Sequence, residues 1–186
     1  MRKAFKIIIA VFAVIVILIV AFGAVVILDL AAYTATGSET LTPTGPSVGK
    51  AIVIYDPGLS GTAKGVADKV ASDLQAQSYT VTLAGIKSSA EAHTTDYGVI
   101  VIGGPVYAGA LTNSVKDSLI NLELSNRAKV GIFESGQGEA SPDDIAQLKQ
   151  SIPTRSDDSL SEAVVVKIGS SEDLNTRAQD FVNQIV

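Results

Sequence analysis

Short runs of valine and isoleucine recur along the chain from residue 50 onward, and segments with helical patterning separate them. The runs at residues 50–55 and 97–106 are flanked by glycine and nearly continuous in apolar character, as in strands buried on both faces of a parallel sheet. Residues 79–86 alternate as a shorter strand, and residues 128–135 and 163–168 are two further predicted strands. Right-handed crossovers arrange such a chain as a doubly wound α/β domain, so we predict a five-stranded parallel sheet sandwiched by helices over residues 50–186.

The segments between the strands carry helix signals. Val66, Val70 and Leu74 recur at the spacing of one helix face. Ser141 is followed by a proline and two aspartates, which predicts a helix start, because the hydroxyl can cap the helix and the carboxylates favour the positive end of its dipole. The Ser-Ser-Glu-Asp run that ends at Asp173 predicts the start of the last helix. Strands and helices therefore alternate, as a doubly wound domain requires.

A long apolar stretch precedes the domain. Residues 7–28 are uncharged and almost wholly apolar. At ~1.5 Å per residue they could cross the ~30 Å hydrocarbon core of a bilayer, which predicts one transmembrane helix. A cleaved signal peptide is the alternative, but its apolar core is ordinarily only ~7–15 residues long.

The charges around this stretch predict its orientation. Three basic residues lie before it, whereas Asp29 and Glu39 follow it, so the positive-inside rule places residues 1–6 in the cytoplasm. We therefore expect a single-pass protein of the cell membrane, with the bilayer as a partner and residues 50–186 outside the cytoplasm. Residues 29–49 are rich in Thr, Ser, Pro and Gly and lack apolar periodicity, which predicts a flexible stalk.

The composition excludes several kinds of chemistry. The chain has no cysteine, which rules out disulfides, thiolate metal sites and cysteine nucleophiles. His93 is the one histidine, and no carboxylates cluster at metal-ligand spacing, so no metal is predicted. With 14 Lys and Arg against 19 Asp and Glu and no basic stripe, nucleic-acid binding is unsupported. Of the two acidic pairs, residues 143–144 fit a helix cap and residues 157–158 a solvated loop, so no catalytic residue is predicted.

Three loops of small residues follow predicted strands, at residues 56–62, 103–109 and 134–139. The carboxyl ends of parallel strands meet at one edge of the sheet, where ligands of doubly wound domains bind, so we expect the three loops to share a rim. The first loop runs into a helix N-terminus, which is a natural anion site. Lys64 is followed by Gly65 instead of Ser or Thr, and the loop also lacks the G-x-G-x-x-G fingerprint, so neither a P-loop nor a dinucleotide fold is indicated.

The loop-into-helix segment SGTAKGVADKV, residues 60–70, resembles the phosphate loop of the flavodoxins and flavodoxin-like flavoproteins. GGPVYAG at 103–109 is similar to the family's second loop, which lies against the flavin ring, and ESGQGE at 134–139 takes the place of the third. The resemblance covers residues 50–186 and implies a flavodoxin-like fold, FMN as cofactor, and Tyr107 as the ring contact. The cofactor-binding residues that it implies are Gly58, Leu59, Ser60, Gly61, Thr62, Pro105, Val106, Tyr107, Ala108, Gly109, Ser135, Gly136 and Gln137.

The first loop departs from the family pattern in two places. Gly58 and Ala63 stand where the family has hydroxyl residues. Since a hydrogen bond to a charged group contributes ~1.5–3 kcal/mol, the loss of two could weaken phosphate binding by ~10²–10⁴-fold. Asp56 would repel a phosphate unless it turns outward as a turn residue, and Glu134 and Glu139 are expected to make the rim negative.

Two functions of different kinds remain open. The first is a membrane-anchored FMN protein acting in electron transfer, either as a carrier with a redox partner protein or as an oxidoreductase. The alternative is an interaction module that has kept the flavodoxin-like frame and lost the flavin. The glycine loops and Tyr107 favour the first, whereas Gly58 and Ala63 favour the second. A flavin-dependent quinone reductase has less support, because no acid–base set is visible.

Overall fold

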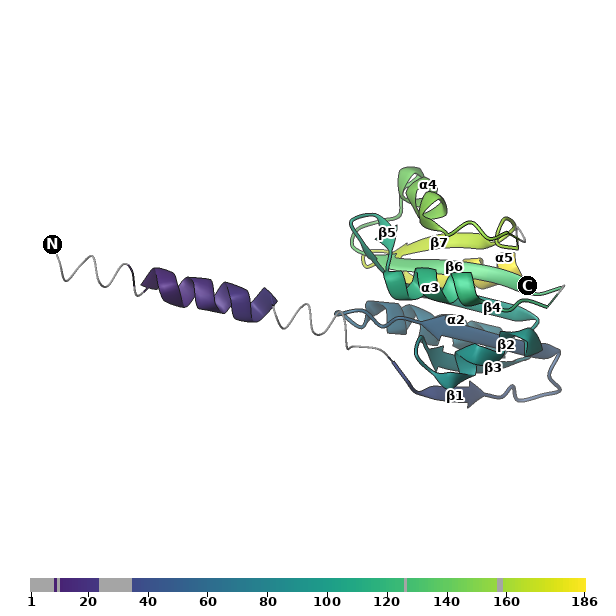
Figure 1. The fold of residues 1–186 in the computed structure, drawn as a ribbon. Helices are drawn as coiled ribbons and strands as arrows, with labels where there is room; N and C mark the ends of the chain where they lie inside the picture. Colours follow the sequence, from purple (N-terminus) through teal and green to yellow (C-terminus); the bar gives the residue numbers. More distant parts are fainter. Residues whose placement is uncertain (1–8, 10, 24–34, 126, 157–158) are drawn as a thin grey trace. The chain divides into compact units, whose positions relative to one another are not determined.

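The computed structural model describes residues 9, 11–23, 35–125, 127–156 and 159–186. The chain divides into two units, residues 1–33 and residues 34–186. Figure 1 traces the elements along the chain.

The described part of the first unit is helical at residue 9 and over residues 11–23. Among the described residues, no helix has both the length and the apolar character needed to cross a membrane, so the predicted transmembrane helix over residues 7–28 is wrong. The rest of that stretch, and the predicted segment 1–6, lie outside the described residues.

The second unit is built on one sheet of seven strands in the order β1-β3-β2-β4-β6-β7, with β5 paired to β4. The strands are β1 (Ser38–Leu41), β2 (Gly49–Tyr55), β3 (Tyr79–Gly85), β4 (Val99–Tyr107), β5 (Ala110–Leu111), β6 (Lys129–Gly136) and β7 (Val164–Gly169). The five predicted strands are present, and their mutual pairings are parallel. β1 and β5 pair antiparallel, so the predicted five-stranded parallel sheet is corrected to a mixed sheet of seven.

Both additional strands have a local cause. β1 lies within the segment predicted as a stalk, and it pairs with the edge strand β3, covering backbone groups that would otherwise be unpaired. Just before β1, the carbonyls of Ala35 and Gly37 accept hydrogen bonds from the amides of Lys87 and Gly85. β5 is the short return of a hairpin from β4. Neither strand is long enough to carry the apolar or alternating pattern that marked the others in the sequence.

The five parallel strands have the order β3-β2-β4-β6-β7, which in chain order is 2-1-3-4-5, the order of flavodoxin-like sheets. From β2, the next strand in the chain, β3, lies on one side, and the strands from β4 onward lie on the other side. The strand order therefore reverses between β2 and β4. Ligands in such sheets bind beyond the carboxyl ends of the strands at this switch point. The first small-residue loop follows β2, and the second segment forms the carboxyl end of β4 and its turn, so both stand at this position.

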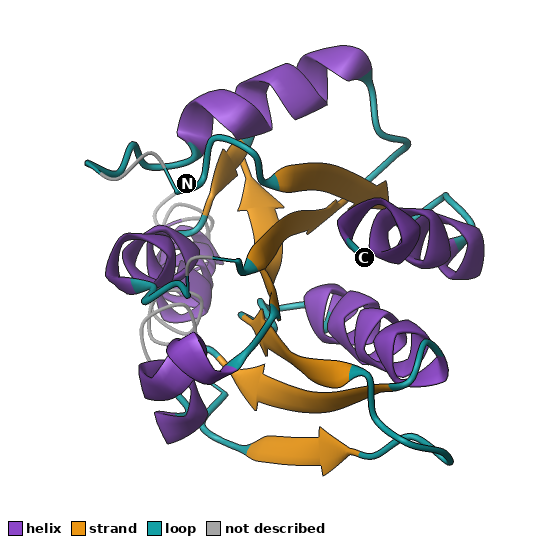
Figure 2. Cartoon of the chain, turned by 90° about the vertical axis from the view of Figure 1, so that its right-hand side faces the viewer, coloured by secondary structure: helices purple, strands orange, loops and turns teal. Residues whose placement is uncertain are grey.

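Helices cover both faces of the sheet (Figure 2). They are α2 (Thr62–Ala76), η1 (Ser89–Asp96), α3 (Asn113–Asn121), α4 (Pro142–Ser151) and α5 (Leu174–Ile185). α2 and α5 share one apolar cluster with alternate residues of β2, such as Val53, while α3 and α4 share the other with Ile52 and Ile54. This alternation buries β2 on both faces, as its continuous apolar run predicted.

We expect Gly85→Ala to loosen β1. A Cβ at Gly85 would collide with the Cβ and carbonyl oxygen of Ala35, so the segment before β1 must move, at a cost of ~1–3 kcal/mol. Urea unfolding of the chain measures this cost, and amide exchange at Lys87, whose N–H donates to Ala35, should accelerate.

Gly65→Ala is the control, because Gly65 lies in α2 with open space around its Cβ position. Alanine there should stabilise by up to ~1 kcal/mol through helix propensity. Equal effects of the two substitutions would show that β1 does not pack as described.

Candidate functional site

The first loop joins β2 to α2 through two left-handed residues. Gly58 has φ +61° and Gly61 has φ +70°, a conformation that glycine adopts without strain. The Gly58 amide donates to Oδ1 of Asp56 at 3.0 Å, which closes the turn. A Cβ on Gly58 would lie 2.6 Å from Cγ of Pro105, so the first loop packs directly on β4.

The N-terminus of α2 carries no side-chain cap. Its N-cap is Gly61, and its first turn holds no acidic residue, whereas α3, α4 and α5 each begin with a side chain that accepts from a backbone amide. Ser60 and Thr62 are exposed beside it, with their hydroxyl oxygens 3.0 Å apart. The positive end of the helix dipole and two hydroxyls therefore face solvent together, which suits an anionic group.

The second loop is a tight hairpin in the structure. β4 continues through Pro105 and Val106 to Tyr107, and the chain then turns at Ala108 (φ +52°) and Gly109 (φ +77°) into β5. Positive φ at both central residues is typical of a two-residue type I′ turn. The turn leaves the Tyr107 side chain 41% exposed at the tip of β4.

The third loop begins later than the sequence predicted. Ser135 and Gly136 are the last residues of β6, and Ser135 is buried in the sheet. Gln137 follows the strand and is exposed. A Cβ on Gly136 would lie 2.6 Å from Cγ1 of Val106, so the end of β6 lies against the second loop.

The structure brings the three loops together on one rim, as their strand-end positions predicted. Tyr107 also connects the first two, because the Leu59 amide donates to its hydroxyl at 3.4 Å. The predicted binding residues thus lie close together, and their role toward a cofactor stays a prediction.

The Asp56 carboxylate is occupied by protein donors. Its Oδ2 accepts from the hydroxyl of Thr112 at 3.1 Å and from that of Ser114, and its Oδ1 accepts from the Gly58 amide. Thr112 and Ser114 lie at the start of α3, so Asp56 ties the first loop to the segment that follows the second. The sequence indicated a charge that could repel a phosphate, but it gave no sign of these hydroxyl partners.

Glu134 does not contribute to a negative rim, contrary to the prediction. It is 1% exposed, and burial raises its pKa to about 7. Its neighbour in the register, Lys167, pairs instead with Asp144, whose Oδ2 lies 2.9 Å from the lysine Nζ. Hydrogen bonds from Lys167 and from Ser141 hold the pKa of Asp144 at about 2. The predicted capping role of the Ser141 segment is confirmed, since Ser141 and Asp144 form a capping box.

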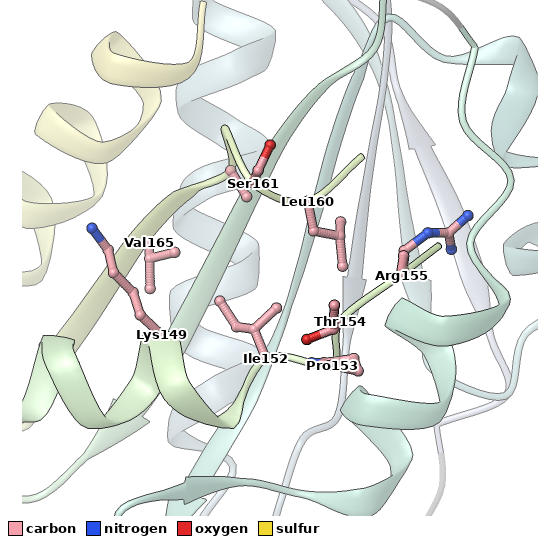
Figure 3. Close-up of a pocket in the computed structure, with 9 residues that line it drawn as sticks. Lys149, Ile152, Pro153, Thr154, Arg155, Leu160, Ser161 and Val165 are labelled. Carbon is pink, nitrogen blue, oxygen red and sulfur yellow. The ribbon is translucent and has the colours of Figure 1, made fainter. Parts of the chain in front are cut away.

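A separate pocket of about 240 Å³ lies where α4 runs into the connection to β7 (Figure 3). Ile152, Pro153 and Leu160 give it an apolar lining. Lys149 and Arg155 also line it, but Figure 3 shows their charged ends pointing to opposite sides. The Arg155 guanidinium donates to the carbonyls at residues 119 and 120, which is a structural bond. We therefore place the candidate site at the three-loop rim.

The similarity of this chain to known proteins is found in its fold and not in its sequence. No protein-family model matches the sequence, and no curated protein is significantly similar to it. Among solved structures, a short-chain flavodoxin associated with a non-canonical PDU bacterial microcompartment matches with TM-score 0.51 and 19% identity, over 73% of this chain and 95% of that chain.

Two further structures are similar. An NADH:FMN oxidoreductase in its apo form has TM-score 0.54 and 15% identity, over 75% of this chain and 91% of its own. Oxidised flavodoxin 2 from Bacillus cereus has TM-score 0.47 and 19% identity, over 73% of this chain and 97% of its own. At these identities the likeness concerns the fold. The two structures with TM-scores above 0.5 confirm the predicted flavodoxin-like fold.

We expect Gly58→Ala to be more damaging than Gly61→Ala. Both substitutions force alanine into a left-handed conformation at ~1–2 kcal/mol, but only the first also drives a Cβ into Pro105, at a further ~1–3 kcal/mol. Urea unfolding of both variants measures the difference. Equal losses would contradict the contact between the first loop and β4.

We expect Asp56→Asn to lower the free energy of unfolding by ~1–3 kcal/mol, because an amide has one acceptor oxygen where the carboxylate serves three donors. Asp68→Asn is the control. It breaks an exposed ion pair with Lys64, which contributes at most ~1 kcal/mol. A loss in Asp56→Asn no larger than in the control would mean that Asp56 does not link the two loops.

Proposed function

We propose that this chain, which has the flavodoxin-like fold, binds FMN at the three-loop rim and acts in electron transfer. One observation carries the proposal: the uncapped N-terminus of α2 stands with the exposed hydroxyls of Ser60 and Thr62 beside the exposed ring of Tyr107, at the switch point of the sheet. A flavodoxin and an NADH:FMN oxidoreductase among the fold relatives support flavin as the ligand class.

The residues present fit the phosphate of FMN. Ser60 and Thr62 can donate hydroxyl hydrogen bonds, and the first-turn amides of α2 supply further donors at the positive end of the helix. The negative charge of Asp56 is offset by its three donors, which include the Gly58 amide. These features favour a dianionic group at the first loop despite the two missing hydroxyls.

The second loop fits the flavin ring. Tyr107 stands at the end of a paired strand, so its backbone is held by the sheet while its aromatic ring is exposed. An aromatic side chain in this setting can stack on a planar heterocycle. Pro105, Val106 and the turn residues would then border the ring edge, as the family resemblance implies.

When bound, FMN would supply the electron-transfer chemistry, and the protein would position it and limit its contact with water. Leu59 is 44% exposed and Tyr107 41% exposed, so two apolar side chains are exposed beside the proposed ring position. A redox partner protein could dock on this surface and approach the flavin edge.

One observation favours the second candidate, an interaction module without flavin. Ala63 is fully buried in the core, and Gly58 is required by its positive φ and by Pro105, so both positions lacking the family's hydroxyls serve packing. Loops shaped in this way could persist after the cofactor is lost.

An FMN titration of the chain, followed by quenching of flavin fluorescence, tests the proposal. We expect micromolar or tighter binding. Ser60→Ala should weaken it ~10–100-fold, because one hydrogen bond to a charged group is lost. Tyr107→Ala should also weaken it, through the loss of stacking worth ~0.5–1.5 kcal/mol.

Ser161→Ala is the matched control, because this exposed serine lines the separate pocket. It should leave the affinity unchanged. Absence of binding at tens of micromolar FMN would contradict the proposed function and support the interaction module.

A further inference from the structure

A row of charged side chains crosses the carboxyl end of the sheet on the face that α3 and α4 cover. Lys167 on β7 is paired in register with Glu134 on β6, and Glu134 is paired with Gly104 on β4. A Cβ at Gly104 would lie 3.0 Å from Cβ of Asp56, which follows β2. Three ionisable residues therefore share one face, with a glycine between the two acids.

The donors around this row are unevenly distributed. Asp56 receives three hydrogen bonds, and Asp144 receives those of Lys167 and Ser141. Within the described residues, Oε1 of Glu134 is buried and has no hydrogen-bond partner. The residue is 1% exposed, and a buried carboxylate oxygen without a donor is costly when the group is ionised.

Lys167 lies between two carboxylates with which it could pair, those of Asp144 and Glu134. It is 8% exposed, and its ammonium bonds Asp144 on α4, although Glu134 is its register neighbour on the adjacent strand, ~4.8 Å away. Its side chain passes over Gly136, where a Cβ would lie 3.4 Å from the lysine Cε. The absence of a side chain at Gly136 leaves room for this lysine.

We propose that Glu134 is a proton-binding site, and that its protonation state determines which carboxylate forms the ion pair with Lys167. With Glu134 protonated, the ammonium stays on Asp144 and holds the first turn of α4 against β7. With Glu134 ionised, the new buried charge draws the ammonium toward β6, and the bond to Asp144 weakens. The proton comes from solvent, and no other bond is made or broken.

The charged groups that face Glu134 set the direction of its titration. Burial raises the pKa of Glu134, and the negative charge of Asp144 raises it further. Lys167 on β7 and Lys116 on α3 lower it. Asp56 is the remaining acid of the row, and β4 contributes only Gly104 at the paired position. The result is a carboxyl with a pKa of about 7, so the switch would operate near neutral pH.

The test is a pH titration of the full chain carrying ¹³C at the glutamate carboxyl carbons, from pH 4 to 9. One carboxyl signal should titrate near pH 7 and be absent in Glu134→Gln. In Lys167→Met that midpoint should rise, because the nearest cation is gone. Glu91→Gln removes another partly buried glutamate and should leave the midpoint unchanged. A Glu134 midpoint between 4 and 5 would overturn the proposal.

The exchange of partners has its own readout. The amides of Ser141 and Asp144 bond within the capping box, so their chemical shifts should follow the Glu134 midpoint. In Glu134→Gln they should be constant around pH 7. If the amide shifts of Ser141 and Asp144 in the wild type do not change at the Glu134 midpoint, the role of Lys167 is overturned. If Glu134→Gln folds poorly, the change of the Glu134 midpoint in Lys167→Met still decides the test.

Stability should show the matching dependence on pH. Because the folded-state pKa of Glu134 lies above its ordinary value of 4.5, the stabilising contribution of its proton is fully present below about pH 4.5. It is lost as the pH rises to about 7. The urea midpoint of the wild type should therefore fall over this window relative to that of Glu134→Gln. Parallel curves for the two proteins would contradict the proton site.

Discussion

The parallel pairing of β2 with both β3 and β4 is the constraint on which the rest of the domain depends. β2 is buried on both faces. Val53 packs into the apolar cluster on one side and Ile52 and Ile54 into the cluster on the other, so the register of β2 is strongly specified. Because β2, β3, β4 and β6 run in the same direction, their carboxyl ends end at one edge. The first two loops of the candidate site take their positions from this pairing, and the parallel pairing of β6 with β4 and β7 places the third loop and the charged row beside them.

Close backbone approach completes the rim. Gly58 accommodates Pro105, Gly136 accommodates Val106 and the Lys167 stem, and Gly104 leaves space beside Asp56. These glycines are required by neighbours that come from other strands, and not only by turns of their own. The same close packing allows Asp56 and Lys167 to reach partners on α3 and α4, so partly buried polar bonds hold the loops and the helices of one face together.

The sequence predicted the elements with long patterns and missed those that depend on distant partners. Apolar runs and alternation predicted all five parallel strands, and Ser141 predicted the start of α4, because these signals are local. β1 was missed because its four residues are held by tertiary partners, chiefly the edge of β3, that lie far along the chain. The apolar stretch at 7–28 suggested a membrane span, whereas no helix among the described residues has both the length and the apolar character to cross a membrane.

The sequence predicted where the candidate site lies, but not the hydrogen bonds that hold it together. Small residues after strands indicated the rim, yet the donors to Asp56 come from Thr112 and Ser114, more than fifty residues further along. The burial of Glu134 could have been inferred, because it lies two positions after Ile132 and so on the same buried face of β6.

The most direct test of the central claim is a map of backbone amide shifts in ¹⁵N-labelled chain as FMN is added. The account predicts that the largest changes fall at residues 58–63, 107–109 and 136–138, the three segments that meet at the rim. Changes confined to residues 149–165 around the separate pocket, or no saturable change at all, would contradict it.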